Sequence, residues 1–153
     1  MTLSFIYDYV ISPKDNKIII KSNNLIKQIR LKDYFINQID QNVNPGVNRL
    51  ILSFNNKSNG KYGEFHPGYN ECNNNNVVSE SSIHIPYINN DQIVYNDRYV
   101  NYTILSIPDK CPSSNRDALQ FEVELFGYDY STKQKNKIGY NDMSLTFEID
   151  FQE

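Results

Sequence analysis

The sequence predicts an all-β fold, an antiparallel β-sandwich of seven or eight strands with at most one or two short helices. Apolar and polar residues alternate in several short segments, as expected of strands that cover a core on one face. Residues that favour turns, mainly Asn, Asp, Pro and Gly, separate these segments. Helical spacing of apolar residues occurs in one segment only, so helices are expected to be a minor part of the fold.

The first predicted strands flank an early turn. Apolar residues recur at alternate positions from Leu3 to Tyr9, Pro13 interrupts the pattern, and Ile18 to Ile20 form a second apolar run. Two such runs around a short turn predict a β-hairpin. Further strands are expected at 47–54, 77–78, 83–87, 92–95 and 99–107.

The clearest strands come last, at 121–125 and 143–151, where apolar residues alternate with acidic or hydroxyl-bearing ones. The segment 25–39 is ambiguous, because its apolar residues approximate helical spacing although Ile29 and Leu31 also fit a strand. We expect one short helix inside 32–41. Long loops are expected at 55–76 and 108–117, and loops of that length are often functional.

Length and composition indicate a single globular domain over residues 1–153, with 39% hydrophobic and 13% aromatic residues. The net charge of −3 disfavours nucleic acid as a partner. Asn favours turns, and for the high number of 22 Asn residues the interpretation that we prefer is AT-rich codon usage rather than function. The N-terminal residues lack the pattern of a signal peptide and no apolar stretch approaches the length of a membrane span, so a cytoplasmic location is expected. No cofactor and no metal are predicted.

Charge is unevenly distributed along the chain. Residues 10–32 are mostly basic, and residues 117–153 are mostly acidic. One interpretation is that the two segments lie on neighbouring strands and neutralise each other. The other is a basic face for an anionic partner such as a membrane surface, with four candidate residues: Lys21, Lys27, Arg30 and Lys32.

The segment 61–72 combines aromatic rings with Gly, Pro and hydrogen-bonding side chains. A sugar-binding loop needs both, because flat apolar rings cover the C–H face of a sugar while polar groups bind its hydroxyls. The alternative is a loop whose rings anchor it to its own sandwich. The candidate ligand-binding residues are Tyr62, Phe65, His66, Tyr69, Asn70 and Glu71.

Other polar groups give weaker indications of chemistry. Oxygen-bearing side chains around 89–97 could contribute to a calcium site, but their spacing matches no EF-hand loop, so a hydrated turn is the preferred interpretation. His84 lies between Ile83 and Ile85 and is expected to point outward from a strand. No nucleotide loop, HExxH or CxxC motif is present, and we expect that the protein is not an enzyme, with no catalytic residues.

The segments 102–108 and 119–139 resemble part of a C2 domain, since an alternating strand runs into an acidic loop that ends in Ile138-Gly139. The resemblance implies an eight-stranded sandwich that docks on membranes or protein partners. Calcium-binding members carry acids at three loop positions, which Gly127, Asp129 and Asn136 occupy here. With one carboxylate among the three, tight calcium binding is not expected.

Three functional hypotheses follow from the sequence. The first is a non-enzymatic, C2-like module that binds a protein or an anionic membrane surface without calcium. The second is a carbohydrate-binding or adhesion module that uses the segment 61–72 to bind a glycan. The third is a structural protein that self-assembles into a homo-oligomer through exposed strand edges rich in Tyr and Asn.

Overall fold

A computed structural model describes residues 2–21, 26–40, 45–56, 80–96, 100–106 and 119–152, and all statements below concern these residues. They form ten β-strands and no helix, which confirms the predicted all-β class. The strands are β1 (Thr2–Ile11), β2 (Lys17–Ile20), β3 (Ile26–Asn37), β4 (Val47–Asn56), β5 (Glu80–Pro86), β6 (Val94–Tyr95), β7 (Tyr102–Ser106), β8 (Leu119–Asp129), β9 (Gln134–Lys137) and β10 (Asp142–Gln152).

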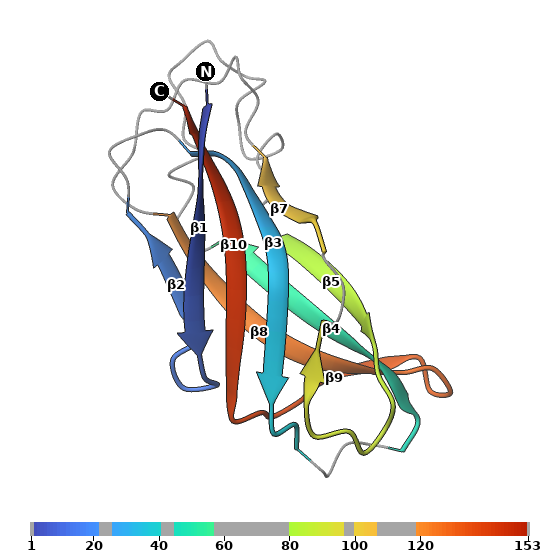
Figure 1. Cartoon of the computed structure of the whole chain (residues 1–153). Helices are drawn as coiled ribbons and strands as arrows, with labels where there is room; N and C mark the ends of the chain where they lie inside the picture. The colour runs from blue at the N-terminus through green and yellow to red at the C-terminus, as the bar shows by residue number, and fades with distance from the viewer. Residues whose placement is uncertain are drawn as a thin grey trace.

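The strands form two antiparallel sheets packed face to face (Figure 1), as predicted for a β-sandwich. In the first sheet the order is β1-β10-β3-β6, and β7 pairs with another part of β3, on the same edge as β6. In the second sheet the order is β2-β8-β4-β5, and β9 pairs with β8. Because β1 pairs with β10 over its whole length, the two ends of the chain lie together at one end of the molecule.

The core lies between the two sheets and is built by the alternating residues of the long strands. Phe147 on β10 is 1% exposed, and its ring contacts Phe54 on β4 edge to face at a centroid distance of 6.0 Å. This pair packs the two sheets together, because aromatic rings bury large apolar areas between the sheets of a sandwich. The predicted one-sided patterns at 121–125 and 143–151 are confirmed, because their apolar residues are buried and the intervening ones are partly or fully exposed.

The prediction of a helix inside 32–41 is wrong, because Ile26–Asn37 is one continuous strand. Against β10 the register shifts at two places, where Lys27 and Lys32 are each one extra residue inserted in β3. Each such β-bulge reverses the alternation of faces beyond it. The buried apolar residues therefore recur at intervals of three and two rather than strictly two, which resembles a helical period: Ile26, Ile29, Leu31, Tyr34 and Ile36.

The predicted hairpin of the first two strands is also wrong. β1 pairs with β10 and β2 with β8, so the two strands belong to different sheets. The turn between them is closed by reciprocal backbone hydrogen bonds between Ser12 and Asp15, each 3.1 Å long. The same turn residues thus make a corner between layers instead of a hairpin. The strand count is ten rather than seven or eight, partly because β9 lies in a segment read as a loop.

Candidate functional site

The free edge of β1 is the most distinctive surface of the described residues. β1 has 10 residues and stands at the end of its sheet, pairing only with β10 among the described strands. In an antiparallel strand, alternate residues direct their N–H and C=O groups to opposite sides. About half of the backbone groups of β1 therefore point away from the sheet, where they form a template for another strand.

Side chains on both faces of β1 are apolar and exposed. Three residues on the core-facing side, Leu3, Phe5 and Tyr7, remain 38%, 48% and 38% exposed. On the outer side, Ile6 and Val10 are 58% and 72% exposed. β1 thus exposes hydrophobic side chains that neither sheet covers.

The core-facing residues of β1 are exposed because the second sheet is short on this side. It ends in β2, which has 4 residues, against 10 in β1. At about 3.3 Å per residue, β2 spans roughly 13 Å and β1 roughly 33 Å. At the end of β1 near the turn, Ile11 is 3% exposed. Phe5 and Tyr7, nearer the other end, contact the ring of Phe151 at 5.9 and 6.5 Å and leave their remaining surface open.

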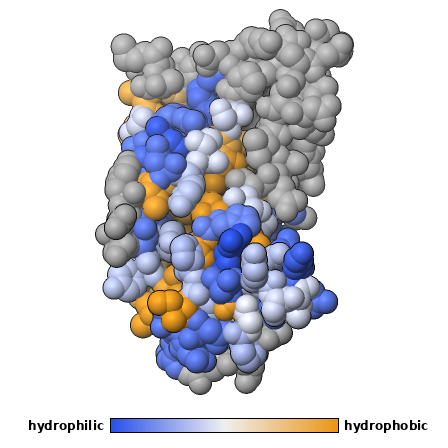
Figure 2. Space-filling model, turned by 90° about the vertical axis from the view of Figure 1, so that its right-hand side faces the viewer, coloured by the Kyte–Doolittle hydropathy of each residue, from blue (hydrophilic) through white to orange (hydrophobic). Residues whose placement is uncertain are grey.

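The other strand edges carry features that hinder pairing with a foreign strand. Opposite β1, the first sheet ends in two separate pieces, β6 with 2 residues and β7 with 5. In the second sheet, β9 and β2 carry lysines, and β5 ends in Pro86. Short edges, lysine and proline all disfavour edge pairing. The side of the molecule with β5 and β7, seen in Figure 2, shows mainly hydrophilic residues with separate hydrophobic patches.

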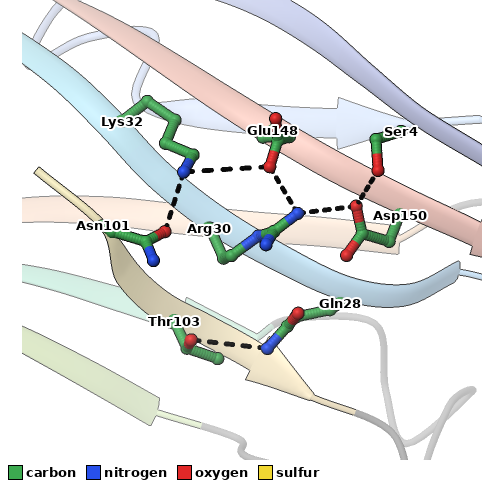
Figure 3. Close-up of polar contacts among 8 residues, drawn as sticks. All are labelled: Ser4, Gln28, Arg30, Lys32, Asn101, Thr103, Glu148 and Asp150. Atoms are coloured by element: carbon green, nitrogen blue, oxygen red, sulfur yellow. Dashed lines mark hydrogen bonds and ion pairs between the residues drawn. The ribbon is translucent and has the colours of Figure 1, made fainter. Parts of the chain in front are cut away.

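A polar network on the outer face of the first sheet fixes β1 to its neighbours (Figure 3). Arg30 forms ion pairs with Glu148 and, at 2.7 Å, with Asp150, whose Oδ1 also accepts a hydrogen bond of 2.6 Å from Ser4 on β1. Lys32 Nζ lies 3.8 Å from Glu148 Oε1 and donates to Asn101 Oδ1 at 2.9 Å. Within this network the two cations balance the two anions.

This network shows how part of the uneven charge of the sequence is arranged in the fold. The acidic residues of β10 and the basic residues of β3 lie on neighbouring strands and neutralise each other. Arg30 and Lys32 are brought together, Lys27 is buried at a bulge of the same strand, and Lys21 lies exposed after β2 of the other sheet. Binding of an anionic surface by these four residues stays a prediction.

The candidate sugar-binding segment, 61–72, lies outside the described residues, as do the expected strand 77–78 and most of the long loops. His84 is exposed between buried neighbours, as expected. Asn89, Asn90 and Asp91 belong to a turn in which Asn90 has a left-handed φ of 82° and Asp91 N donates to Ile88 O at 3.1 Å. No group of three His, Cys, Asp or Glu residues suited to a metal is found in the described part of the chain.

Asp129, in the segment resembling a C2 domain, has a structural role at the end of β8. Its Oδ1 accepts hydrogen bonds from Ser131 Oγ at 2.6 Å, Ser131 N at 2.9 Å and Thr132 N at 3.3 Å. These bonds, led by that of the Ser131 hydroxyl, hold the pKa of Asp129 below its ordinary value although burial opposes them. The carboxylate thereby closes the turn between β8 and β9.

The edge of β1 differs from the strand edges that the sequence hypothesis of self-assembly describes. That hypothesis expects edges rich in Tyr and Asn, whereas β1 contains two Tyr and no Asn, and self-assembly stays a prediction. The signal was present in the sequence, because Ile6 and Val10 place apolar residues on the side of the strand opposite Phe5 and Tyr7. A strand that is apolar on both sides is either fully buried or, as here, an exposed edge.

Comparison with known proteins assigns no family. No family model matches the sequence, and no curated protein matches it. Among solved structures, the chain is similar to the selenomethionine-labelled penton protein of mavirus, with a TM-score of 0.37 and 8% identity over 98% of this chain and 100% of that one. A similarity this low assigns neither a shared topology nor a function. None of the described residues forms a helix long and apolar enough to cross a membrane.

Proposed function

We propose that this protein is a non-enzymatic interaction module that binds a β-strand of another polypeptide along the free edge of β1. The observation that carries the proposal is the combination, in one 10-residue edge strand, of backbone groups that no described strand pairs with and hydrophobic side chains exposed on both faces. Strand addition of this kind derives affinity from main-chain hydrogen bonds and specificity from alternate side chains.

The composition of β1 supports this proposal. The strand contains no Lys, Arg or Pro, and its one charged residue, Asp8, accepts a hydrogen bond of 2.7 Å from Thr146 Oγ1 on the adjacent strand. Natural proteins usually place charged residues, especially Lys, or Pro in a long edge strand to prevent pairing with a foreign strand. An edge that lacks them, beside others that have them, is suited to a partner.

The charge beside the edge favours a neutral partner. Arg30 and Lys32 interact with Glu148 and Asp150, so the outer face next to β1 offers no unbalanced cation to an acidic ligand. A strand of low net charge with apolar residues on both faces fits this surface. The C2-like membrane-docking and glycan-binding hypotheses stay predictions beside this one, since no contact among the described residues favours either.

Strand binding is tested with fluorescein-labelled peptides and fluorescence anisotropy. Two probes are used, a ten-residue peptide of alternating threonine and valine and a peptide with the sequence of residues 2–11. At least one probe is expected to bind the wild-type chain. Ile6→Lys, which places a charge on the edge at an exposed position, is expected to weaken binding at least tenfold. The matched control Ile19→Lys, on the exposed face of β2, is expected to leave it unchanged.

If the chain is a monomer and neither peptide binds it at millimolar concentration, or if both variants bind as the wild type does, the proposed function is wrong. Circular dichroism and thermal unfolding of both variants verify that the sandwich is intact. Both changes are compatible with the fold because Ile6 and Ile19 are 58% and 47% exposed.

A further inference from the structure

The geometry of β1 points to a specific partner, and we propose that it is β1 of a second copy of this chain. The inference rests on the proposed function of the edge and adds the occupant and the register. The two strands pair antiparallel about a twofold axis that passes beside Ile6, so that Ile6 lies opposite Ile6 of the second copy. The first sheets of the two copies then form one continuous sheet.

Backbone geometry limits the possible registers. In an antiparallel pair, a residue whose N–H and C=O groups point toward the partner lies opposite a residue of the same kind. For two identical strands, odd-numbered residues must therefore lie opposite odd-numbered ones and even opposite even. Near the middle of β1, the twofold axis can then pass beside Phe5, Ile6, Tyr7 or Asp8.

Charge and coverage distinguish these four registers. An axis at Asp8 places two carboxylates directly opposite each other, which is destabilising. An axis at Tyr7 places each Asp8 opposite Ile6, an apolar residue. An axis at Phe5 leaves Tyr9, Val10 and Ile11 beyond the end of the partner's β1, although Val10 is the most exposed hydrophobic residue of β1, at 72%.

The register with the axis at Ile6 avoids these faults and leaves only Ile11, which is already buried, beyond the partner's β1. On the outer face it places Asp8 opposite Ser4 and Val10 opposite Thr2. On the core-facing side it places Phe5 opposite Tyr7 and Leu3 opposite Tyr9. Aromatic and aliphatic cross-strand pairs stabilise a sheet, so the exposed apolar residues of β1 acquire suitable partners.

Charge complementarity also favours the chain's own strand over a foreign one. Asp8 is already bonded to Thr146, so an opposing strand needs a polar residue without negative charge at that position and apolar residues elsewhere. β1 supplies this pattern to itself. Twofold pairing is also closed, because each copy covers the edge of the other and neither β1 remains free to add a third chain.

Cysteine cross-linking tests the register directly. Four single cysteine variants are made in the full chain, in which the two cysteines of the sequence are first replaced by Cys72→Ser and Cys111→Ser. The four variants are Phe5→Cys, Ile6→Cys, Tyr7→Cys and Asp8→Cys. Residues directly opposite in antiparallel strands have Cα atoms about 4.5–5.5 Å apart, within the range of about 4.4–6.8 Å that a disulfide requires. A residue one place from the axis lies about 7 Å further along the partner strand, beyond that range.

Under mild oxidation, Ile6→Cys is expected to give a covalent dimer and the other three variants are expected to remain largely uncross-linked. A maximum at another position, or equal cross-linking at all four, overturns the register. If none cross-links and the chain sediments as a monomer while still binding the threonine–valine peptide, self-pairing is wrong and the proposed function stands. If the peptides do not bind either, both are wrong.

Discussion

Replacing Phe147 by alanine measures how firmly the two sheets are joined. Phe147 is 1% exposed, and its ring lies 5.8 Å from that of Tyr9 on β1 and 6.0 Å from that of Phe54 on β4. Because these neighbours are anchored in both sheets, the cavity left by the ring cannot close easily. Removing a buried phenylalanine costs about 3–5 kcal/mol, and we expect Phe147→Ala to lower the free energy of unfolding by an amount near the top of that range.

The matched control is Phe5→Ala on the edge strand. Full burial of a phenylalanine contributes about 1.5–3 kcal/mol. Phe5 is 48% exposed and contacts one ring, that of Phe151, so the loss in the isolated chain should be near 1 kcal/mol. Two identical substitutions on neighbouring strands should therefore differ severalfold in their effect on stability.

Urea unfolding followed by tyrosine fluorescence is the assay for both variants. Both are made in the Ile6→Lys background, in which association through β1 is expected to be lost, so that the free energies describe the single chain. Equal m-values are required for the comparison, because m reports the surface exposed on unfolding. If Phe5→Ala costs as much as Phe147→Ala, Phe5 is part of the core and the edge is not available to a partner.

Three further outcomes are expected. Asp129→Asn should make the free energy of unfolding less sensitive to acid. The hydrogen bonds of Ser131 and Thr132 lower the pKa of Asp129, so the stabilisation by the carboxylate is present above its ordinary pKa near 3.8 and is lost as the pH falls through the pKa of the folded state. Urea unfolding at pH 7 and pH 3 measures this effect, and an equal acid-induced loss in wild type and variant would contradict it. Gly46→Ala should cost about 1–3 kcal/mol, because the new Cβ would lie 2.6 Å from Asp129 Oδ2, whereas Gly139→Ala, whose Cβ would approach Asp40 only to 3.6 Å, should be nearly neutral in thermal unfolding. Tyr140→Phe should stabilise the protein by roughly 1 kcal/mol, because it removes a buried hydroxyl without a hydrogen-bond partner; a less stable variant would mean that the hydroxyl is bonded. Burial also raises the pKa of Tyr140 to about 12, so between pH 10 and 12 the wild type should lose more stability than the variant, which keeps the raised pKa values of Tyr9 and Tyr87.

The strands that could be predicted from the sequence are those with one face buried throughout. At 121–125 and 143–151 the pattern is strictly alternating, and β8 and β10 follow it. In β3 the bulges at Lys27 and Lys32 shift the alternation twice, so a local pattern resembled a helix although tertiary pairing made a strand. The positions of the bulges depend on pairing with β10, which is distant in the sequence, so the local pattern of residues does not reveal them.

Long-range pairing also explains the remaining differences. The turn 12–16 has the residues of a hairpin, but β1 pairs with β10 at the other end of the chain, so the turn became a corner between layers. The same pairing makes β1 an edge. Its apolar residues were visible in the sequence, but their exposure depends on β2 having only 4 residues beside the 10 of β1. The sequence therefore indicated that some strand edge could be exposed, but it did not indicate that this edge is β1.

The most direct test of the account is sedimentation equilibrium with charge-exchanged variants at Ile6. The wild type is expected to form a dimer. Ile6→Lys and Ile6→Glu alone are each expected to be monomeric, because each would place two like charges opposite each other at the axis, and an equimolar mixture of the two is expected to form a heterodimer. Val10→Lys and Val10→Glu serve as the control pair, since their mixture gains no such contact in this register. A monomeric wild type, or a mixture that associates no better than its components, would contradict pairing of β1 with itself.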